Sequence, residues 1–253
     1  MADGFVKEPA VATRKDFNPS SVSPERLEQI KLEDAVHYHD HVAVELDRYH
    51  RITGHPLVRP FILVVAQDTD HARRIHAFIE SEEFFKGRFK DKVIEVHSAQ
   101  RGDESDEAMQ RLVALETDGR TEIVIHVNKL KEGWDVTNLY TIVPLRASAS
   151  DILTEQTLGR GLRLPYGARV ARGQDDEFAS LDRLTVIAHD RFDEIINKAN
   201  EPGSIIRRKI EIGEGGDVAA TGATLIECRR NDAHRPSAAN ARLCRPRGAG
   251  LRI

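Results

Sequence analysis

Residues 123–145 read IVIHVNKLKEGWDVTNLYTIVPL, and this stretch decides how the rest of the chain is interpreted. Its two ends, 123–127 and 139–145, are short continuous apolar runs, which are typical of strands buried on both faces of a parallel sheet. The polar loop between them carries Gly133 and Asp135. Because glycine has no side chain, a ligand can approach the main chain closely at Gly133.

Further apolar runs occur at 61–66, 93–96 and 184–188. Segments with apolar residues at helical spacing separate them, and strands that alternate with helices predict an α/β fold. We therefore expect three layers, with a mainly parallel sheet covered by helices on both faces. Ligands of such sheets bind at the carboxyl ends of the strands, so we expect the functional residues to share that edge.

A second motif, QTLGRGLRLP, occupies residues 156–165. In a helix, Gln156, Arg160 and Arg163 would face one way, because they stand at positions i, i+4 and i+7. Two fixed cations beside a polar side chain suit a phosphate group whose charge changes during a reaction. The alternative is that the two arginines form ordinary ion pairs on the surface.

The two motifs carry a family resemblance. EGWDVTN, at 132–138, and QTLGRGLRLP resemble the fifth and sixth motifs of superfamily-two helicases. Within that superfamily the chain is most similar to the helicase (Res) subunit of type III restriction enzymes and to related DEAD/DEAH-box proteins. The resemblance covers roughly residues 8–212. It implies a RecA-like fold of the P-loop NTPase type, in the form of the second, C-terminal motor domain of a helicase.

The resemblance also implies roles for single residues. Arg160 and Arg163 would be arginine fingers reaching the γ-phosphate of ATP, which an N-terminal motor domain outside this chain would hold with Mg²⁺. The other implied nucleotide contacts are Gly133, Asp135 and Gln156. The implied DNA contacts are Thr69, Ser98, Asn128 and Lys129. Each of the DNA contacts also fits an ordinary cap or loop residue.

A phosphate-binding loop of the form GxxxxGK[ST] does not occur in the sequence, and no Asp-Glu pair follows an apolar strand. We therefore expect no ATP hydrolysis by this chain alone. The leading hypothesis is the C-terminal half of an ATP-dependent translocase on duplex DNA, partnered by an N-terminal helicase domain and a methyltransferase (modification) subunit. The alternatives are a stand-alone, non-enzymatic module that binds nucleic acid or protein, and an unrelated small-molecule transferase on a doubly wound sheet.

Changes in composition divide the chain into segments. We expect a linker remnant at 1–22, a helical extension at 23–56, the RecA-like domain at 57–203, an edge strand or the start of a next module at 204–216, and an irregular, arginine-rich tail at 217–253. The abrupt change at the tail is also what a truncated or frame-shifted gene end would produce.

Overall composition excludes some classes of protein. A hydrophobic fraction of 40%, a charged fraction of 31% and a net charge of −4 fit an ordinary soluble domain. No apolar run reaches membrane-spanning length, no signal-peptide core begins the chain, and Cys228 and Cys244 lack metal-ligand spacing. We expect a cytoplasmic protein that does not bind a membrane.

His37 and His41 stand one helical turn apart and could hold a metal ion together with Asp34 or Glu45. The alternative is a polar helix face on which the histidines pair with nearby acids. We expect no metal site, because no second ligand cluster occurs elsewhere in the sequence.

Overall fold

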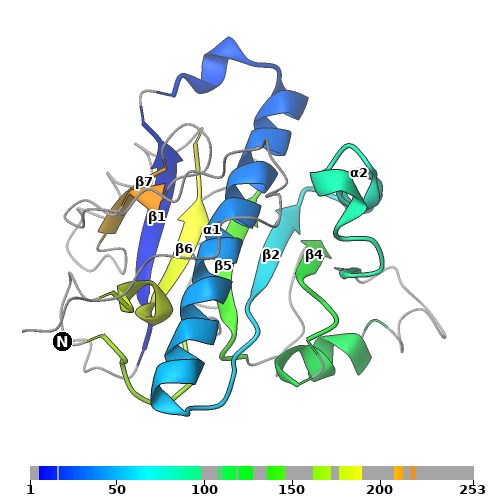
Figure 1. The fold of residues 1–253 in the computed structure, drawn as a ribbon. Coiled ribbons are helices and arrows are strands. Elements are labelled where there is room, and N and C mark those ends of the chain that lie inside the picture. Colours follow the sequence, from blue (N-terminus) through cyan, green and yellow to red (C-terminus); the bar gives the residue numbers. More distant parts are fainter. Residues whose placement is uncertain are drawn as a thin grey trace, which may run out of the picture. The chain divides into compact units, whose positions relative to one another are not determined.

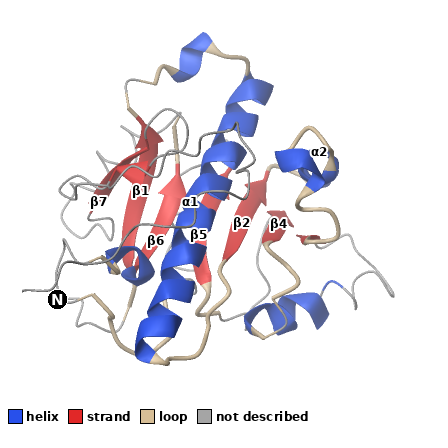
Figure 2. Cartoon of the chain, viewed as in Figure 1, coloured by secondary structure: helices blue, strands red, loops and turns tan. Residues whose placement is uncertain are grey.

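The computed structural model has an eight-stranded sheet at its centre (Figure 1 and Figure 2). It describes residues 6–15, 17–97, 108, 110–117, 119–127, 136–145, 162–171, 177–189, 208–212 and 218–219. The strands are β1 (Glu8–Arg14), β2 (Phe61–Ala66), β3 (Val93–Val96), β4 (Ile123–Val127), β5 (Leu139–Pro144), β6 (Arg183–Ile187), β7 (Arg208–Ile212) and β8 (Val218–Ala219). The helices are α1 (Pro24–Thr53) and α2 (Thr69–Glu80), with 3₁₀ turns η1 (Pro19–Ser21), η2 (Phe85–Gly87), η3 (Ala114–Glu116) and η4 (Ala179–Asp182).

The sheet confirms the predicted fold class. Its strands follow the order β3-β4-β2-β5-β6-β1-β7-β8. Strands β1 to β7 pair in parallel, and only the two-residue β8 pairs antiparallel, with β7. Every residue of β2 and β5 is buried, which explains why these strands read as continuous apolar runs.

The two faces of the sheet have separate cores. On one face, Val64 of β2 belongs to a cluster of buried residues with Leu32 of α1 and Ile75 of α2. On the other face, Leu63 belongs to a second cluster that includes Leu115 of η3. Figure 2 shows α1 lying across the first face, over β5. The alternation along β2 therefore gives the three layers expected from the sequence.

Strand β1 corrects the expectation of a linker remnant at 1–22. It lies inside the sheet, where Ala10 pairs with Thr185 of β6 on one side and Arg208 of β7 on the other. Ala10, Val11 and Ala12 are fully buried. These small residues give a weak hydrophobic signal, and both partner strands lie far along the sequence.

Helix α1 is the N-terminal helix that the sequence predicts within 23–56. The Ser23 hydroxyl accepts the N–H of Arg26, and Gly54 ends the helix with φ +73°, a left-handed conformation that favours glycine. The helix packs against β2, β5 and β6 and supplies a large share of the core on its face of the sheet. It is thus an integral layer of the domain.

The C-terminal segments also differ from expectation. Strand β7 falls within the expected 204–216 segment, but it lies between β1 and β8 and so is not the last strand of the sheet. Strand β8 falls within the tail that we expected to be irregular, at 217–253. Residues 224–253 form a separate unit that lies outside the described residues. Within the described ranges, no helix combines the length and hydrophobicity needed to span a membrane.

Candidate functional site

The carboxyl edge of the sheet, where β2 and β3 end, carries the start of α2. Asp68 caps this helix by accepting the N–H of His71 at 2.8 Å, and Thr69 is the first helical residue and half-buried. The Nδ1 atom of His71 accepts the N–H of Gln67 at 3.2 Å, and its Nε2 lies 3.1 Å from a carboxylate oxygen of Glu28 on α1. Because the Asp68 carboxylate already occupies this helix start, an incoming phosphate would have to approach through the Thr69 hydroxyl.

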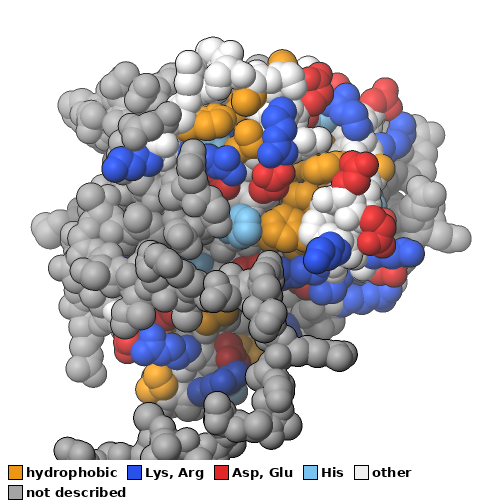
Figure 3. Space-filling view, turned by 45° about the horizontal axis from the view of Figure 1, so that its top comes forward, with side chains coloured by type: hydrophobic (Ala, Val, Ile, Leu, Met, Phe, Trp, Pro, Cys, Tyr) orange, Lys and Arg blue, Asp and Glu red, His pale blue; other side chains and the backbone are white. Residues whose placement is uncertain are grey.

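Acidic and basic side chains alternate around this edge. Figure 3 brings the edge forward and shows both signs of charge side by side over its described surface. On α2, Arg73 pairs with Asp70 at 2.8 Å, and Arg74 lies 3.8 Å from Glu28. The described part of the edge is therefore charge-balanced, and sequence-independent binding of DNA phosphates, which needs net positive charge, has little support from it.

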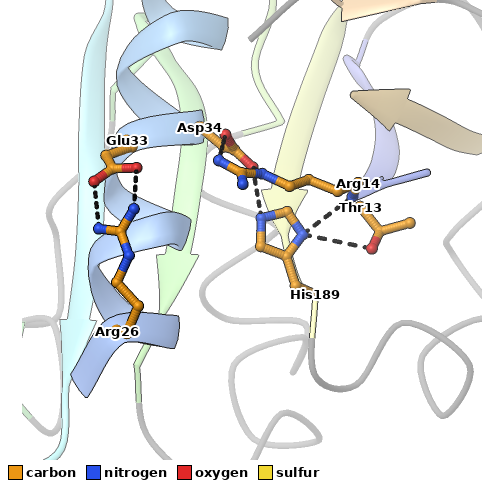
Figure 4. A network of polar contacts seen from close by, with 6 residues as sticks. All are labelled: Thr13, Arg14, Arg26, Glu33, Asp34 and His189. Atoms are coloured by element: carbon orange, nitrogen blue, oxygen red, sulfur yellow. Dashed lines mark hydrogen bonds and ion pairs between the residues drawn. The ribbon is translucent and has the colours of Figure 1, made fainter. Parts of the chain in front are cut away.

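A buried cluster of charged side chains lies close by. Asp34 of α1 is fully buried and accepts two hydrogen bonds from Arg14, at 2.7 and 2.8 Å (Figure 4). The same carboxylate lies 2.8 Å from Nε2 of His189, which follows β6. Burial opposes ionisation of Asp34, but the hydrogen bonds from His189 and Arg14 outweigh it and lower the pKa of the carboxyl group. The cluster ties α1 to the carboxyl ends of β1 and β6.

This cluster has the outline of a hydrolytic triad, since the Thr13 hydroxyl lies 3.4 Å from Nδ1 of His189. Two features argue against that chemistry. Nδ1 also accepts the N–H of Arg14, at 3.3 Å, and the Arg14 guanidinium neutralises Asp34. A general base needs a free ring nitrogen and an oriented carboxylate, so we interpret the cluster as structural.

The cluster also engages Asp34, one of the two acids considered for a metal site with His37 and His41. The ring of His37 packs edge-on against Phe85, with centroids 5.4 Å apart. Burial lowers the pKa of His41, and Arg183 adds to this effect. Among the residues that the structure describes, no group of three His, Cys, Asp or Glu side chains is arranged to hold a metal ion.

Described residues from both sequence motifs meet at the amino edge of the sheet, where the parallel strands begin. Arg163 forms an antiparallel bridge with Val6, two residues before β1, and the N–H of Lys7 donates to the Leu162 oxygen. The Lys7 side chain donates to the main-chain oxygen of Thr137, which belongs to the EGWDVTN motif. Segments far apart in the sequence are thus joined at one end of β1.

The position of Arg163 corrects one expectation. We expected it to share the carboxyl edge with Thr69, but it lies at the opposite edge. Leu145 follows the carboxyl end of β5, whereas Leu162 lies at the amino edge, where its main-chain oxygen accepts the N–H of Lys7. The expectation from the sequence placed every site residue at the carboxyl ends of the strands, because ligands of parallel sheets commonly bind there.

Most predicted site residues fall outside the described residues. Of the nine, the structure describes Thr69 and Arg163; the others are Ser98, Asn128, Lys129, Gly133, Asp135, Gln156 and Arg160. In the sequence, Ser98 follows the end of β3 closely and Asn128 follows the end of β4 directly. Their roles stay predictions.

Sequence reasoning missed the buried ionisable residues Lys7 and His189, and it did not predict that Asp34 pairs with Arg14 and His189. The partners of Lys7 and His189 lie far away in the sequence, so no local motif predicts these contacts. The one available signal is a charge beside an apolar strand, and that signal is common on protein surfaces.

Comparisons with known proteins agree with the motif-based prediction. The chain is 29% identical over 115 residues to the Res subunit of the type III restriction-modification enzyme EcoPI from Escherichia phage P1, a match covering 40% of this chain and 12% of the relative. It is 29% identical over 114 residues to the EcoP15I Res subunit from Escherichia coli, covering 39% of this chain and 12% of the relative. The matches thus span about an eighth of the length of these relatives. No protein-family model matches the chain.

Solved structures with a similar arrangement include restriction and DEAD-box proteins. A fragment described as an HsdR subunit of a type I restriction enzyme from Vibrio vulnificus has 19% identity and a TM-score of 0.45, covering 86% of this chain and 39% of that chain. Dbp5 from S. cerevisiae, bound to RNA and ADP BeF3, has 15% identity and a TM-score of 0.42, covering 82% of this chain and 41% of that chain. With its parallel sheet and its paired motifs, the chain is similar in sequence to type III restriction Res subunits, which agrees with the resemblance found from the motifs.

Proposed function

We propose that this chain is the second motor domain of an ATP-dependent DNA translocase of the type III restriction kind. In this proposal Arg160 and Arg163 act on the γ-phosphate of ATP·Mg²⁺ held by a first motor domain, and Gly133, Asp135 and Gln156 contact the nucleotide. The observation that carries the proposal is the convergence at the amino edge, where Lys7 contacts Thr137 of the first motif and Leu162 of the second. Phosphoryl transfer depends on positioning and charge rather than on covalent help, so two motifs held together are what such a site needs.

The DNA contact belongs to the other edge in this proposal. Thr69 lies at the carboxyl edge, and Ser98, Asn128 and Lys129 follow strands that end there. Nucleotide and DNA would then be bound at opposite ends of the same strands. Closure of two motor domains over ATP would be transmitted along the sheet to the DNA contacts, with a modification subunit as a further partner.

The experiment supplies a first motor domain from a Res relative, by fusion or in trans, and measures DNA-stimulated ATP hydrolysis. We expect turnover in the combined protein and a loss of about 10³-fold or more in Arg160→Ala and in Arg163→Ala, as for other arginine fingers. Arg51→Ala is the matched control, since Arg51 is exposed on α1 and forms a surface ion pair with Asp47 of the same helix.

Two outcomes contradict the proposal. Equal activity in the arginine variants and the Arg51→Ala control would remove the finger role. An absence of ATP hydrolysis with DNA binding intact would favour the alternative of a stand-alone, non-enzymatic module of the same fold.

A further inference from the structure

Lys7 is the most deeply buried charged side chain at the amino edge. It is 0% exposed, and its ammonium group donates to the main-chain oxygens of Thr137 and Leu139, the latter at 2.8 Å. The nitrogen also lies 4.2 Å from the centre of the Tyr140 ring, at a distance suited to a cation–π contact. The main-chain N–H of the same residue donates to the Leu162 oxygen.

An ammonium group in this position is costly, because burial removes its hydration. Carbonyl oxygens and an aromatic face replace part of the lost water. A methionine of similar length would fill the same space without that cost. The retention of a charge here therefore points to its hydrogen bonds, which an apolar side chain cannot make.

The three main-chain partners of Lys7 lie beside the candidate nucleotide residues. Thr137 is the second residue after Asp135, and Leu162 stands between Arg160 and Arg163 in the sequence. A displacement of about 1 Å at a catalytic group can lower a rate by about 10²-fold, so the register between the two segments matters.

We propose that Lys7 is a positioning residue, which holds the end of the Gly-Asp loop at Thr137 and the arginine segment at Leu162 in one fixed register. This inference rests on the proposed function for its catalytic meaning, but the mechanical link between the two segments can be tested without it.

The charge state of Lys7 gives the link a measurable signature. Burial lowers the pKa of Lys7 to about 7, while Glu116 of η3 and Asp182 of η4 act in the opposite direction. The phenol of Tyr140 lies beside the Lys7 nitrogen, and the guanidinium of Arg169 donates to the oxygen of the neighbouring residue Val6. An opened state that exposes Lys7 to water binds its proton more tightly, so protonation favours opening. The link should therefore tighten as pH rises above about 7, by up to about tenfold in the opening equilibrium per pH unit.

The first experiment measures amide hydrogen exchange in the full chain, corrected for the intrinsic pH dependence of exchange. Between pH 7 and 9 we expect protection of residues 136–139 and 162–164 to rise more steeply than protection of β2. In Lys7→Met this extra slope should vanish. Lys31→Met is the matched control. Lys31 is also buried and donates to the Pro144 oxygen at the other end of β5, and its replacement leaves Lys7 intact.

The second experiment measures DNA-stimulated ATP hydrolysis in the combined protein. Lys7→Met should lower kcat by about 10- to 100-fold with a smaller change in DNA affinity, because the proposed DNA contacts lie at the other edge.

An unaltered exchange slope in Lys7→Met, or an equal loss of the slope in Lys31→Met, overturns the inference whatever the result of the ATPase measurement. If Lys7→Met does not fold, the wild-type slope decides: no excess over β2 overturns the inference. A wild-type protein with the exchange signature but without ATP hydrolysis supports the link and contradicts only the proposed function.

Discussion

Replacing Asp34 with alanine should destabilise the fold far more than replacing its neighbour Glu33. Both acids stand on α1 and both bind an arginine at 2.7 Å, Asp34 with Arg14 and Glu33 with Arg26 (Figure 4). They differ in burial: the Asp34 side chain is 0% exposed, whereas the Glu33 pair is 29% and 49% exposed. The comparison therefore sets a buried carboxylate, which also contacts His189, against an exposed one with the same arginine distance.

The structure gives the expected magnitudes. Removing Asp34 leaves Arg14 and His189 facing a buried site without a carboxylate, and breaking a buried pair from one side costs about 3–5 kcal/mol. Removing Glu33 breaks a solvent-exposed pair, which contributes about 0.2–1 kcal/mol. Both changes replace an acid by alanine in the same helix, so the gain in helix propensity largely cancels between them.

Urea unfolding followed by far-UV circular dichroism measures both variants against the wild type. The pKa of Asp34 is lowered in the folded state, so its contribution should be fully present above about pH 4 and be lost as pH falls through the folded value. A double-mutant cycle with Arg14→Ala gives the coupling between the two side chains. Losses of equal size in Asp34→Ala and Glu33→Ala at neutral pH would refute the reasoning.

Two further changes test local features of the fold. Gly119→Ala should destabilise the fold more than Gly54→Ala. Both glycines have positive φ, +59° and +73°, which costs about 1–2 kcal/mol for alanine, but of the two only Gly119 would place the new Cβ against a side chain, that of Arg59. Urea unfolding midpoints measure both variants, and equal losses would contradict the expected clash with Arg59. A hydrogen bond to Glu95 is the main cause that raises the pKa of His76, so this pair should stabilise the fold fully below about pH 6.5 and less as pH rises through the folded pKa. The difference in unfolding free energy between wild type and Glu95→Gln should therefore shrink from pH 5.5 to 8.5. A difference that stays constant over this range would refute the assignment.

Strands with strong local signals were predicted correctly from the sequence. The run at 61–66 forms β2, and its continuous apolar pattern reflects burial on both faces. The caps Ser23, Asp68 and Gly54 mark helix ends through hydrogen bonds to near neighbours, which a local pattern captures. Features of this kind depend on a few consecutive residues.

Features that depend on distant partners were not predicted. Strand β1 contains small residues and Pro9, and it is a strand because β6 and β7 flank it. In the sequence, nothing distinguishes Lys7 from an exposed lysine, because Thr137 and Leu139, whose main-chain oxygens accept its hydrogen bonds, lie far along the chain. Arg163 was expected at the wrong edge of the sheet, because the motif indicates which residues act together but does not indicate the edge at which they lie.

The place of β1 between two late strands has a consequence for biosynthesis. Within this sheet, residues 8–14 leave the ribosome before the other strands, yet their partners are at 183–187 and 208–212. This segment must therefore stay unpaired until β6 and β7 have been made, while β2, β4 and β5 can already associate. The strand of the sheet that is made first thus docks late, and assembly at the amino edge can be completed only after nearly the whole sheet exists.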